Sequence, residues 1–403
     1  MTKEKSTVPR LRFPGFTDAW KQRKLGEVLK ERNESRSPSA DVPLVSFTVE
    51  NGVTPKTERY NREFLVRDED KKYKFTQLDD IVYNPANLKF GAIARNKYGA
   101  AVFSPIYVTY GVLSEAHPLF VELIVTSTNF IQRALRYQEG TVYERMAVKS
   151  FDLLRSEIPL PTLPEQEAIG SFFSDLDQLI TLHQRKLDDV KELKKALLQK
   201  MFLKGNGNDF PELRFPEFTD AWKQRKLGEV AEMYSGGTPS VGRKDYYAGG
   251  IPFIRSAEIN SDTTELYLTE LGLNNSSAKM VSKGSLLYAL YGATSGEVGL
   301  SRLDGAINQA ILAILPNDDL TTEFLMYWLR REKSTIVEKY LQGGQGNLSA
   351  GIVKQLEPTI PTLPEQEAIG SFFSDLDQLI TLHQRQLDHL KLLKKALLQQ
   401  MFI

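Results

Sequence analysis

The sequence PTLPEQEAIGSFFSDLDQLITLHQR occupies residues 161–185 and recurs unchanged at residues 361–385. A second sequence, LRFPGFTDAWKQRKLGEV at residues 11–28, recurs at 213–230 with one change, from glycine to glutamate. We call each copy of the second sequence an opening frame. The chain therefore repeats the order of opening frame, middle segment and end segment, once in each half.

The two middle segments, 29–160 and 231–360, share no obvious sequence, and each is about 130 residues long, the size of one domain. The sequence KGNGND at 204–209 marks the break between the halves. The domain boundaries that we expect are 1–160 for the first frame and globular domain, 161–204 for the first repeated helix, 205–360 for the second frame and globular domain, and 361–403 for the second repeated helix.

The repeated end segment predicts a long helix. Thr162 and Glu165 fit a capping box, and Pro164 lies in the first turn, where its missing N–H loses no hydrogen bond. Seam positions then follow at alternating spacings of four and three, a heptad pattern sustained over more than four heptads. The seam positions are Ile169, Phe173, Leu176, Ile180, His183, Leu187, Val190, Lys194, Leu197 and Met201, with Ile369, Phe373, Leu376, Ile380, His383, Leu387, Leu390, Lys394, Leu397 and Met401 in the second copy.

Two like helices in one chain can bury their seams on each other, and a middle segment of domain size can return the second helix antiparallel. The alternative is two separate helices, each packed on its own core. The pattern outlasts a typical globular helix, which favours the paired arrangement.

The middle segments have the patterns of mixed α/β domains. Strand-like runs occur at 43–49 and 100–113 in the first segment and at 284–292 and 306–315 in the second. A helical stretch near 119–138 and an amphipathic helix at 322–341 follow in the respective segments. The expected fold class is therefore α/β (α+β) globular domains plus long α-helices, as two pseudo-symmetric halves of one fold joined by an antiparallel two-helix coiled coil.

The composition excludes several classes of function. The chain has no cysteine, so disulfides, thiolate nucleophiles and cysteine zinc sites are absent. No apolar run is long enough to span a membrane, and the first residues lack a secretory signal, so we expect a cytoplasmic protein. Lys plus Arg and Asp plus Glu both number 51, so net charge alone does not favour nucleic acid.

The sequence shows no catalytic motif. YNPAN at 83–87 lacks the second proline and the aromatic residue of an amino-methyltransferase motif. GTPSVGRK at 237–244 has Arg243 where a phosphate loop requires lysine. The four histidines have no metal-ligand spacing, so no metal site is expected. These observations favour a non-catalytic binding protein.

Over its full length the chain resembles the DNA specificity subunit of type I restriction–modification systems. The resemblance rests on Trp20 with Leu25-Gly26-Glu27 in the first frame and Trp222 with Leu227-Gly228-Glu229 in the second. In the helices it rests on Pro161, Leu163, Glu165, Gln166, Ile169 and Asp177, and on Pro361, Leu363, Glu365, Gln366, Ile369 and Asp377.

This resemblance implies two target-recognition domains, which read the two halves of a split, asymmetric site in double-stranded DNA, while the helices set the gap. It implies that two modification (methyltransferase) subunits and two restriction subunits assemble around the chain. Those partners would carry S-adenosylmethionine, ATP and Mg, and this chain would hold no cofactor. The partner-binding residues that we expect are Glu165, Gln166, Asp177, Glu365, Gln366 and Asp377.

Candidate DNA-binding residues lie in glycine-containing segments, where the backbone can approach a ligand closely. Arginine, asparagine and glutamine suit base edges, whereas lysine and serine suit phosphates. The residues that we select are Lys89, Arg95, Asn96, Lys97, Tyr291, Thr294, Ser295, Gln345 and Asn347. The alternative for each is a solvated loop residue.

Two other classes of function remain open from the residues alone. A two-headed protein adaptor would bind a different protein on each middle segment, and competition with random DNA separates it from a DNA reader. A stand-alone modification enzyme would crosslink to S-adenosylmethionine, although the cofactor motifs are lacking.

Overall fold

The computed structural model describes residues 8–55, 72–139, 146–203, 210–341 and 347–402. The chain forms two compact units. Unit 1 comprises residues 1–183 and 386–403, and unit 2 comprises residues 184–385. Each unit therefore combines one globular domain with a part of both long helices.

The elements of unit 1 alternate short strands with short helices before the long helix. Its strands are β1 (Lys21–Lys24), β2 (Leu29–Glu31), β3 (Ser35–Arg36), β4 (Val45–Thr48), β5 (Gly52–Pro55), β6 (Tyr73–Thr76), β7 (Ile81–Tyr83), β8 (Ile93–Arg95), β9 (Ala101–Phe103), β10 (Val108–Val112) and β11 (Glu157–Leu160). Its helices are η1 (Leu25–Glu27), η4 (Leu88–Phe90), α1 (Pro118–Val125), α2 (Thr128–Ala134), η5 (Leu135–Tyr137) and α3 (Ser150–Leu154).

Unit 2 has the same general order of elements. Its strands are β12 (Lys223–Gln224), β13 (Ala231–Ser235), β14 (Tyr247–Ile254), β15 (Tyr267–Leu268), β16 (Lys279–Val281), β17 (Leu286–Ala289), β18 (Val298–Leu300), β19 (Gly305–Ile307), β20 (Ile311–Pro316) and β21 (Thr359–Ile360). Its helices are α5 (Leu227–Val230), η6 (Lys244–Tyr246), η7 (Ser256–Glu258), α6 (Glu270–Asn274), α7 (Thr322–Leu341) and α8 (Ala350–Lys354).

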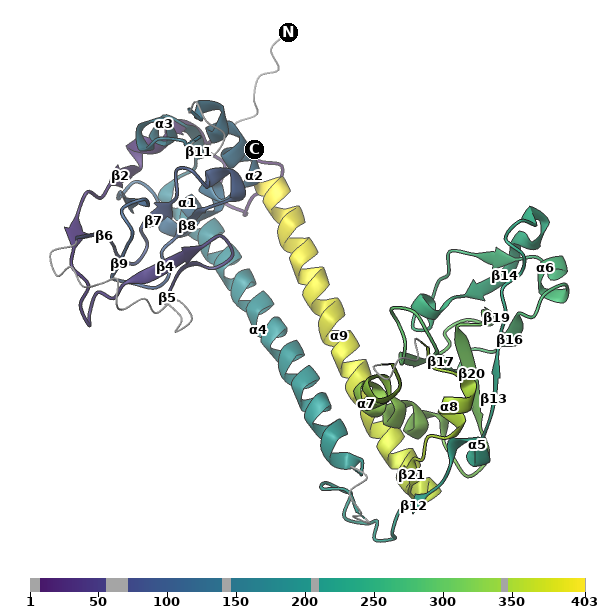
Figure 1. Cartoon of the computed structure of the whole chain (residues 1–403). Coiled ribbons are helices and arrows are strands. Elements are labelled where there is room, and N and C mark those ends of the chain that lie inside the picture. Colours follow the sequence, from purple (N-terminus) through teal and green to yellow (C-terminus); the bar gives the residue numbers. More distant parts are fainter. Residues whose placement is uncertain (1–7, 56–71, 140–145, 204–209, 342–346, 403) are drawn as a thin grey trace. The chain divides into compact units, whose positions relative to one another are not determined.

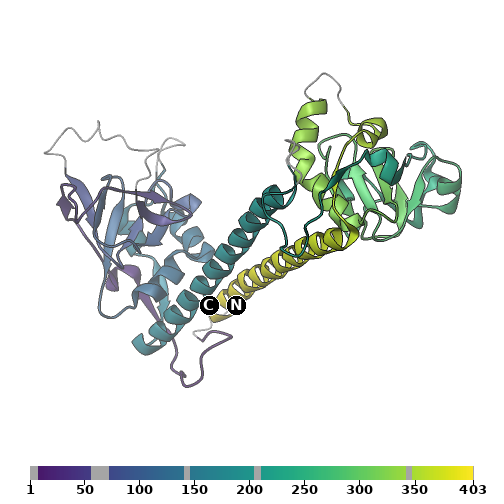
Figure 2. The same ribbon diagram turned by 90° about the horizontal axis from the view of Figure 1, so that it is seen from below.

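The two long helices, α4 (Leu163–Met201) and α9 (Leu363–Met401), follow the repeated end segments. In unit 2, Lys194 of α4 pairs with Asp377 of α9, and the ring of Phe202 lies 6.1 Å from that of Phe373. In unit 1, Lys394 lies 2.5 Å from Asp177. Residue numbers rise along one helix as they fall along the other, so within each unit the helix segments run antiparallel (Figure 1, Figure 2). This confirms the predicted helix pairing inside each unit.

The inner sheets of the two units have one topology. Unit 1 has the strand order β2-β10-β7-β8, and unit 2 has the equivalent order β13-β20-β17-β18. In each unit a two-stranded sheet also joins the opening frame to the strand before the long helix, as β1-β11 and β12-β21. The middle segments therefore share one fold, as their patterns predicted, although their sequences differ.

The outer sheets are related but not equal. In unit 2 the order is β15-β14-β19-β16, with β14 parallel to β19. In unit 1 the pairs β4-β5 and β6-β9 correspond, and among the residues that the structure describes an isolated parallel bridge between Leu44 and Val102 links them. Unit 1 adds β3 beside β6. Variation between the units is therefore concentrated in the outer layer.

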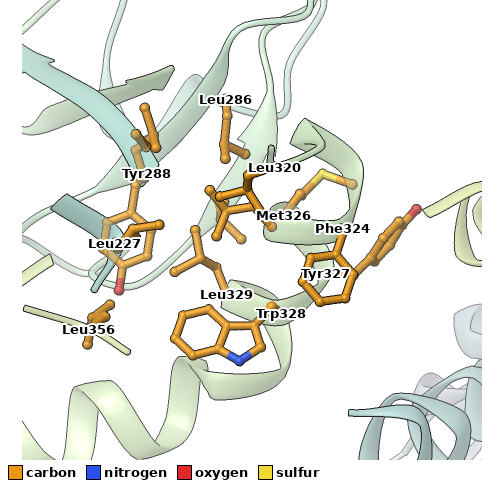
Figure 3. Packing of buried hydrophobic residues seen from close by; sticks show 14 of the residues in the cluster. Leu227, Leu286, Tyr288, Leu320, Phe324, Met326, Tyr327, Trp328, Leu329 and Leu356 are labelled. Atoms are coloured by element: carbon orange, nitrogen blue, oxygen red, sulfur yellow. The ribbon is translucent and has the colours of Figure 1, made fainter. Parts of the chain in front are cut away.

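The core of unit 2 lies between α7 and the inner sheet. Phe324 and Leu329 of α7 are fully buried in one cluster with Leu286 and Tyr288 of β17 (Figure 3). Burial raises the pKa of the Tyr288 hydroxyl. In unit 1 the corresponding core contains Trp20, Phe120 and Phe173, and Met401 of α9 belongs to it. The helix ends are thus part of each core rather than an appendage.

Two local predictions need correction. The helical stretch expected near 119–138 is divided into α1, α2 and η5, because the Ser127 side chain accepts a hydrogen bond from the Phe130 N–H and starts a new helix. The Glu165 carboxylate binds Arg12 and Trp20 instead of closing a capping box. Within the described residues, no helix combines the length and the apolar character that a membrane span requires.

Candidate functional site

An arginine clamps each opening frame to the start of the following long helix. The Arg12 guanidinium donates two hydrogen bonds to the fully buried Glu165 carboxylate, with Nε to Oε1 at 2.6 Å and Nη2 to Oε2 at 2.7 Å. In unit 2, Arg214 binds Glu365 in the same way, with both distances 2.7 Å. Hydrogen bonding to the carboxylate raises the pKa of each arginine. In each unit one bidentate ion pair therefore joins the opening frame to the long helix.

In each unit a buried glutamine of the long helix binds the start of a helix in the globular domain. The Gln166 Oε1 atom accepts the His117 N–H at the start of α1 (2.9 Å), and its Nε2 donates to the Pro161 carbonyl (3.0 Å). Gln366 repeats this arrangement with the Thr321 N–H (2.8 Å) before α7 and the Pro361 carbonyl (3.0 Å). Helices α1 and α7 of the unlike domains thus begin at the same glutamine contact in the two units.

Four of the residues expected to bind partners have this internal role. Glu165, Gln166, Glu365 and Gln366 have at most 1% exposed surface. Their side chains are engaged in hydrogen bonds within the chain, and their burial argues against a direct partner contact. The physical reason is that their own opening frames and short helices already cover them.

The two aspartates of that set join the long helices. Asp177 pairs with Lys394 at 2.5 Å. Asp377 pairs with Lys194 and also accepts hydrogen bonds from Tyr327 (2.9 Å) and Arg330 (3.1 Å). Burial lowers the pKa of Lys194, although the hydrogen bond to Asp377 opposes this shift. These carboxylates fix the helix register.

The long helices also expose leucines in both copies. Leu182 is 48% exposed, and its repeat Leu382 is 52% exposed. Leu179 and Leu379 lie three residues earlier in the two copies, and both are exposed. We call these four leucines the repeated apolar face. The helices therefore present the same apolar surface twice.

In unit 2 the repeated apolar face borders an open groove of about 980 Å³. Leu379 and Leu382 line it together with Lys283, Arg302 and Arg385. Asp375 and Asp377 line it as well, so the groove combines apolar side chains with charged groups of both signs.

The candidate residues of unit 1 fall into two places. Lys89 lies in η4, in the β7–β8 hairpin loop, with its Nζ 4.9 Å from the centre of the Phe90 ring. The side chain of Phe90 is 62% exposed. Arg95, Asn96 and Lys97 lie at the other end of β8. The structure therefore separates Lys89 from the other three residues.

The three residues at the end of β8 are engaged within the unit. Arg95 pairs with Asp79 (2.6 Å) and Glu122 (2.8 Å). Lys97 also pairs with Glu122 (2.8 Å). The buried Asn96 amide binds the backbone of Gln77 and Gly99. A structural role accounts for Arg95 and Asn96, and Lys97 keeps an exposed side chain.

The described candidates of unit 2 lie close together. Tyr291, Thr294 and Ser295 occupy the β17–β18 hairpin loop, and the Ser295 hydroxyl donates to the Gly292 carbonyl (2.9 Å). Asn347 is exposed and precedes Leu348, whose N–H donates to the Leu290 carbonyl (2.9 Å) in the same loop. Gln345 lies outside the described residues.

The hairpin loops of the two units occupy equivalent positions. In unit 1 the Val148 N–H donates to the Pro85 carbonyl (3.1 Å), as Leu348 does to Leu290 in unit 2. The same loop thus carries Lys89 in one unit and Tyr291 in the other. No group of three or more histidine, aspartate or glutamate residues in the described part of the chain could hold a metal ion.

Two exposed polar residues, Thr238 and Gln309, are not among the candidates expected from the sequence. Thr238 follows β13 within the segment GTPSVGRK, and Gln309 connects β19 to β20. The Thr238 hydroxyl donates to the Gln309 side-chain oxygen. Glycines beside Thr238 were the only sequence signal, because nothing local brings together residues 71 positions apart.

One α/β fold is thus present twice, with repeated arginine–glutamate and glutamine anchors and with different loops. Residues 17–192 and 219–392 match the family described as the type I restriction modification DNA specificity domain. The chain belongs to this family.

Similar proteins include a putative type I restriction enzyme specificity subunit, MjaX, from Methanocaldococcus jannaschii. It is 24% identical over 65% of this chain and 62% of the relative. The EcoR124I/EcoR124II specificity subunit of Escherichia coli is 23% identical over 60% of each chain. The chain thus spans less than two thirds of the length of these curated relatives.

The crystal structure of a type I restriction–modification S subunit from M. genitalium has a similar fold. Its TM-score is 0.65 at 15% identity, and the match covers 98% of this chain and 99% of that one. This likeness supports the fold described above.

Proposed function

We propose that this chain is the DNA-sequence specificity subunit of a type I restriction–modification enzyme, with no catalytic activity of its own. The observation that carries the proposal is the pair of units with one fold, one set of buried anchors and unlike loops. Identical anchors would place two readers alike, and unlike loops would read unlike half-sites. The target would be a split, asymmetric sequence in double-stranded DNA.

We assign the reading of bases to the hairpin loops. Lys89, Tyr291, Thr294 and Asn347 lie in or beside these loops, where direct contacts to bases and phosphates are sterically open. Because the net charge is zero, partner subunits would supply much of the attraction to phosphates.

The proposed assembly contains two modification and two restriction subunits, which would supply S-adenosylmethionine, ATP and Mg chemistry in the cytoplasm. We place the docking of the modification subunits on the repeated apolar face, because a surface that occurs twice suits two copies of one partner. The long helices would set the gap, and four residues inserted after Leu187 add about 6 Å of helix. Such an insertion should lengthen the gap and keep both half-sites.

The central test is to map methylated adenines across the genome of cells with and without this gene. A split asymmetric site that is methylated only when the gene is present supports the proposal. If the purified complex binds random DNA as well as any methylated site, the two-headed protein adaptor becomes the better explanation.

The docking surface has a separate test. Leu182→Asp and Leu382→Asp should each reduce the number of bound modification subunits from two to one, and the double variant should bind none. Leu78→Asp, at an exposed leucine outside the long helices, is the matched control. Native mass spectrometry of the purified complex counts the subunits, and two subunits on the double variant would contradict this surface.

A further inference from the structure

In unit 2 the segment that follows β13 lies in close contact with the connection between β19 and β20. Gly236 follows β13, and a Cβ atom at this position would lie 1.8 Å from the Ile307 carbonyl oxygen. Only glycine allows this approach, since real Cβ contacts do not fall below 3.0 Å. The approach places the 236–238 segment against the β19–β20 connection. A local cluster of side chains results at the junction of the two sheets.

The side chain of Gln309 stands at the centre of this cluster. The Thr238 hydroxyl donates a hydrogen bond to the Gln309 Oε1 atom, and the Tyr291 hydroxyl lies near the Gln309 amide. Thr238 and Gln309 are exposed, and Tyr291 is half-buried. The amide is therefore held in one orientation while its surface remains open to a ligand.

Backbone hydrogen bonds tie the cluster to the hairpin loop. The Leu290 N–H donates to the Ala310 carbonyl (2.8 Å), and the Leu348 N–H donates to the Leu290 carbonyl (2.9 Å). The Asn308 side chain accepts the Ala310 N–H (3.1 Å), which shapes the connection that holds Gln309. Gln309, Tyr291 and Asn347 thus belong to one connected surface.

The chemistry of this surface favours base edges over phosphates. Thr238, Gln309, Tyr291 and Asn347 are all uncharged. A glutamine amide can accept from adenine N6 through Oε1 and donate to adenine N7 through Nε2 in the major groove. The hydrogen bond from Thr238 leaves this pairing possible, because the amide oxygen has two lone pairs and Thr238 uses only one of them. Prior orientation also reduces the entropy lost on binding.

We propose that Gln309, oriented by Thr238, reads an A·T base pair in the half-site assigned to unit 2. This inference rests on the proposed DNA-recognition function. The equivalent connection of unit 1, between β9 and β10, carries Ser104 and the 61% exposed Ile106. No amide stands there, so the two units would not read the same base pair at this position.

The experiment uses the full chain in its complete modification complex. Methylomes are compared for wild type, Gln309→Ala, Gln309→Glu, Thr238→Val and the control Gln224→Ala. Gln224 is a glutamine of β12 in the same unit, whose amide binds Glu357 (3.1 Å). Competition binding with duplexes altered at each position of the site then gives the discrimination per base pair.

Gln309→Ala should relax one base pair of one half-site, where wild type prefers A·T roughly 5- to 150-fold. Gln309→Glu should shift the preference at that pair toward C·G, because a carboxylate accepts from cytosine N4. Thr238→Val should weaken the same preference by less. The Gln224→Ala control should keep the wild-type site.

Other outcomes overturn the inference. Unchanged discrimination in Gln309→Ala, or an equal loss at every position, would reject Gln309 as a base reader while leaving the proposed function standing. Relaxation confined to the half-site of unit 1 would also reject it. The absence of gene-dependent, site-specific methylation in wild-type cells would instead reject the proposed function itself.

Discussion

Units 1 and 2 differ least where side chains are buried and most where they are exposed. Arg12 with Glu165 and Arg214 with Glu365 have nearly the same geometry. The connections before β10 and β20 share a position in the fold but not a surface. The two units therefore differ in their exposed connections while the arginine–glutamate pairs beneath stay alike.

The support itself is not fully equal in the two units. The Trp20 Nε1–H donates to Glu165 at 3.3 Å, whereas the buried Trp222 Nε1 has no hydrogen-bond partner in the described structure. Asp377 is bound by Tyr327 and Arg330 as well as by a lysine. These differences make the two units distinguishable by matched variants.

The largest expected effect comes from removing one unit. Residues 1–206 keep the first globular domain and α4 but lose residues 386–402, which complete the core of unit 1 through Met401 and Phe402. Met201 and Phe202 do the same for unit 2. A second copy of the fragment can therefore supply the missing helix, and we expect a two-fold symmetric dimer.

With the modification subunit, this dimer should methylate a palindromic split site that repeats the half-site of unit 1. Analytical ultracentrifugation and methylome sequencing measure the two outcomes. Phe202→Ala in the fragment should weaken the dimer. A fragment that stays monomeric and folded would contradict the claim that the end of α4 can replace the end of α9 in the core of unit 1.

A smaller effect is expected from the buried ion pairs. Arg214→Ala leaves the Glu365 carboxylate buried without its guanidinium, at a cost of about 3–5 kcal/mol. Arg12→Ala should cost less, because Trp20 still donates to Glu165. Hydrogen exchange, resolved by unit, measures both losses. Equal losses would show that the hydrogen bond from Trp20 adds no stability. The double variant Arg214→Met with Glu365→Leu should recover the stability that Arg214→Ala loses.

The repeated glycines of the helices should give a still smaller difference. A Cβ at Gly170 would lie 2.7 Å from the Leu119 Cβ and 3.1 Å from the backbone nitrogen of Phe120. At Gly370 the nearest atom is the Glu323 Cβ at 2.9 Å. Overpacking costs about 1–3 kcal/mol, and the better helix propensity of alanine offsets roughly 0.5–1 kcal/mol of it. Gly170→Ala should destabilise more than Gly370→Ala in urea unfolding, and the reverse order would contradict this packing.

The smallest effect is a pH dependence confined to the outer layer of unit 2. Burial would raise the pKa of Glu258, but Arg255 and the backbone N–H groups of Arg255 and Glu265 hold that pKa at about 2. Because the folded-state pKa is lowered, the stabilisation is present above pH 4.5 and is lost as the pH falls toward 2. Glu258→Gln should flatten this part of the stability curve of unit 2. An unchanged slope in hydrogen exchange would contradict it.

Much of the fold was predictable because its signals are local or repeated. The heptad spacing identified α4 and α9, and their copies made pairing possible. The amphipathic pattern at 322–341 identified α7. The break at Ser127 was not anticipated, because one hydroxyl decided between one helix and two.

The candidate site was less predictable. Lys89 and Tyr291 were selected from glycine-containing segments and do lie in equivalent loops. Arg95 and Asn96 have the same residue types but bind within unit 1. Residue type suggests what a side chain can bind, whereas exposure decides whether a ligand can reach it.

The sequence by itself determined that this protein has two copies of one framework, two long seam helices and two unlike domains, because repetition and periodicity are properties of the chain order. Only the tertiary structure decided that Glu165 and Gln166 are internal supports and that Thr238 orients Gln309. Arg12 is 153 positions from Glu165, and Thr238 is 71 positions from Gln309. Such contacts form only when the packing of whole domains brings remote segments together and sets which side chains remain in contact with water.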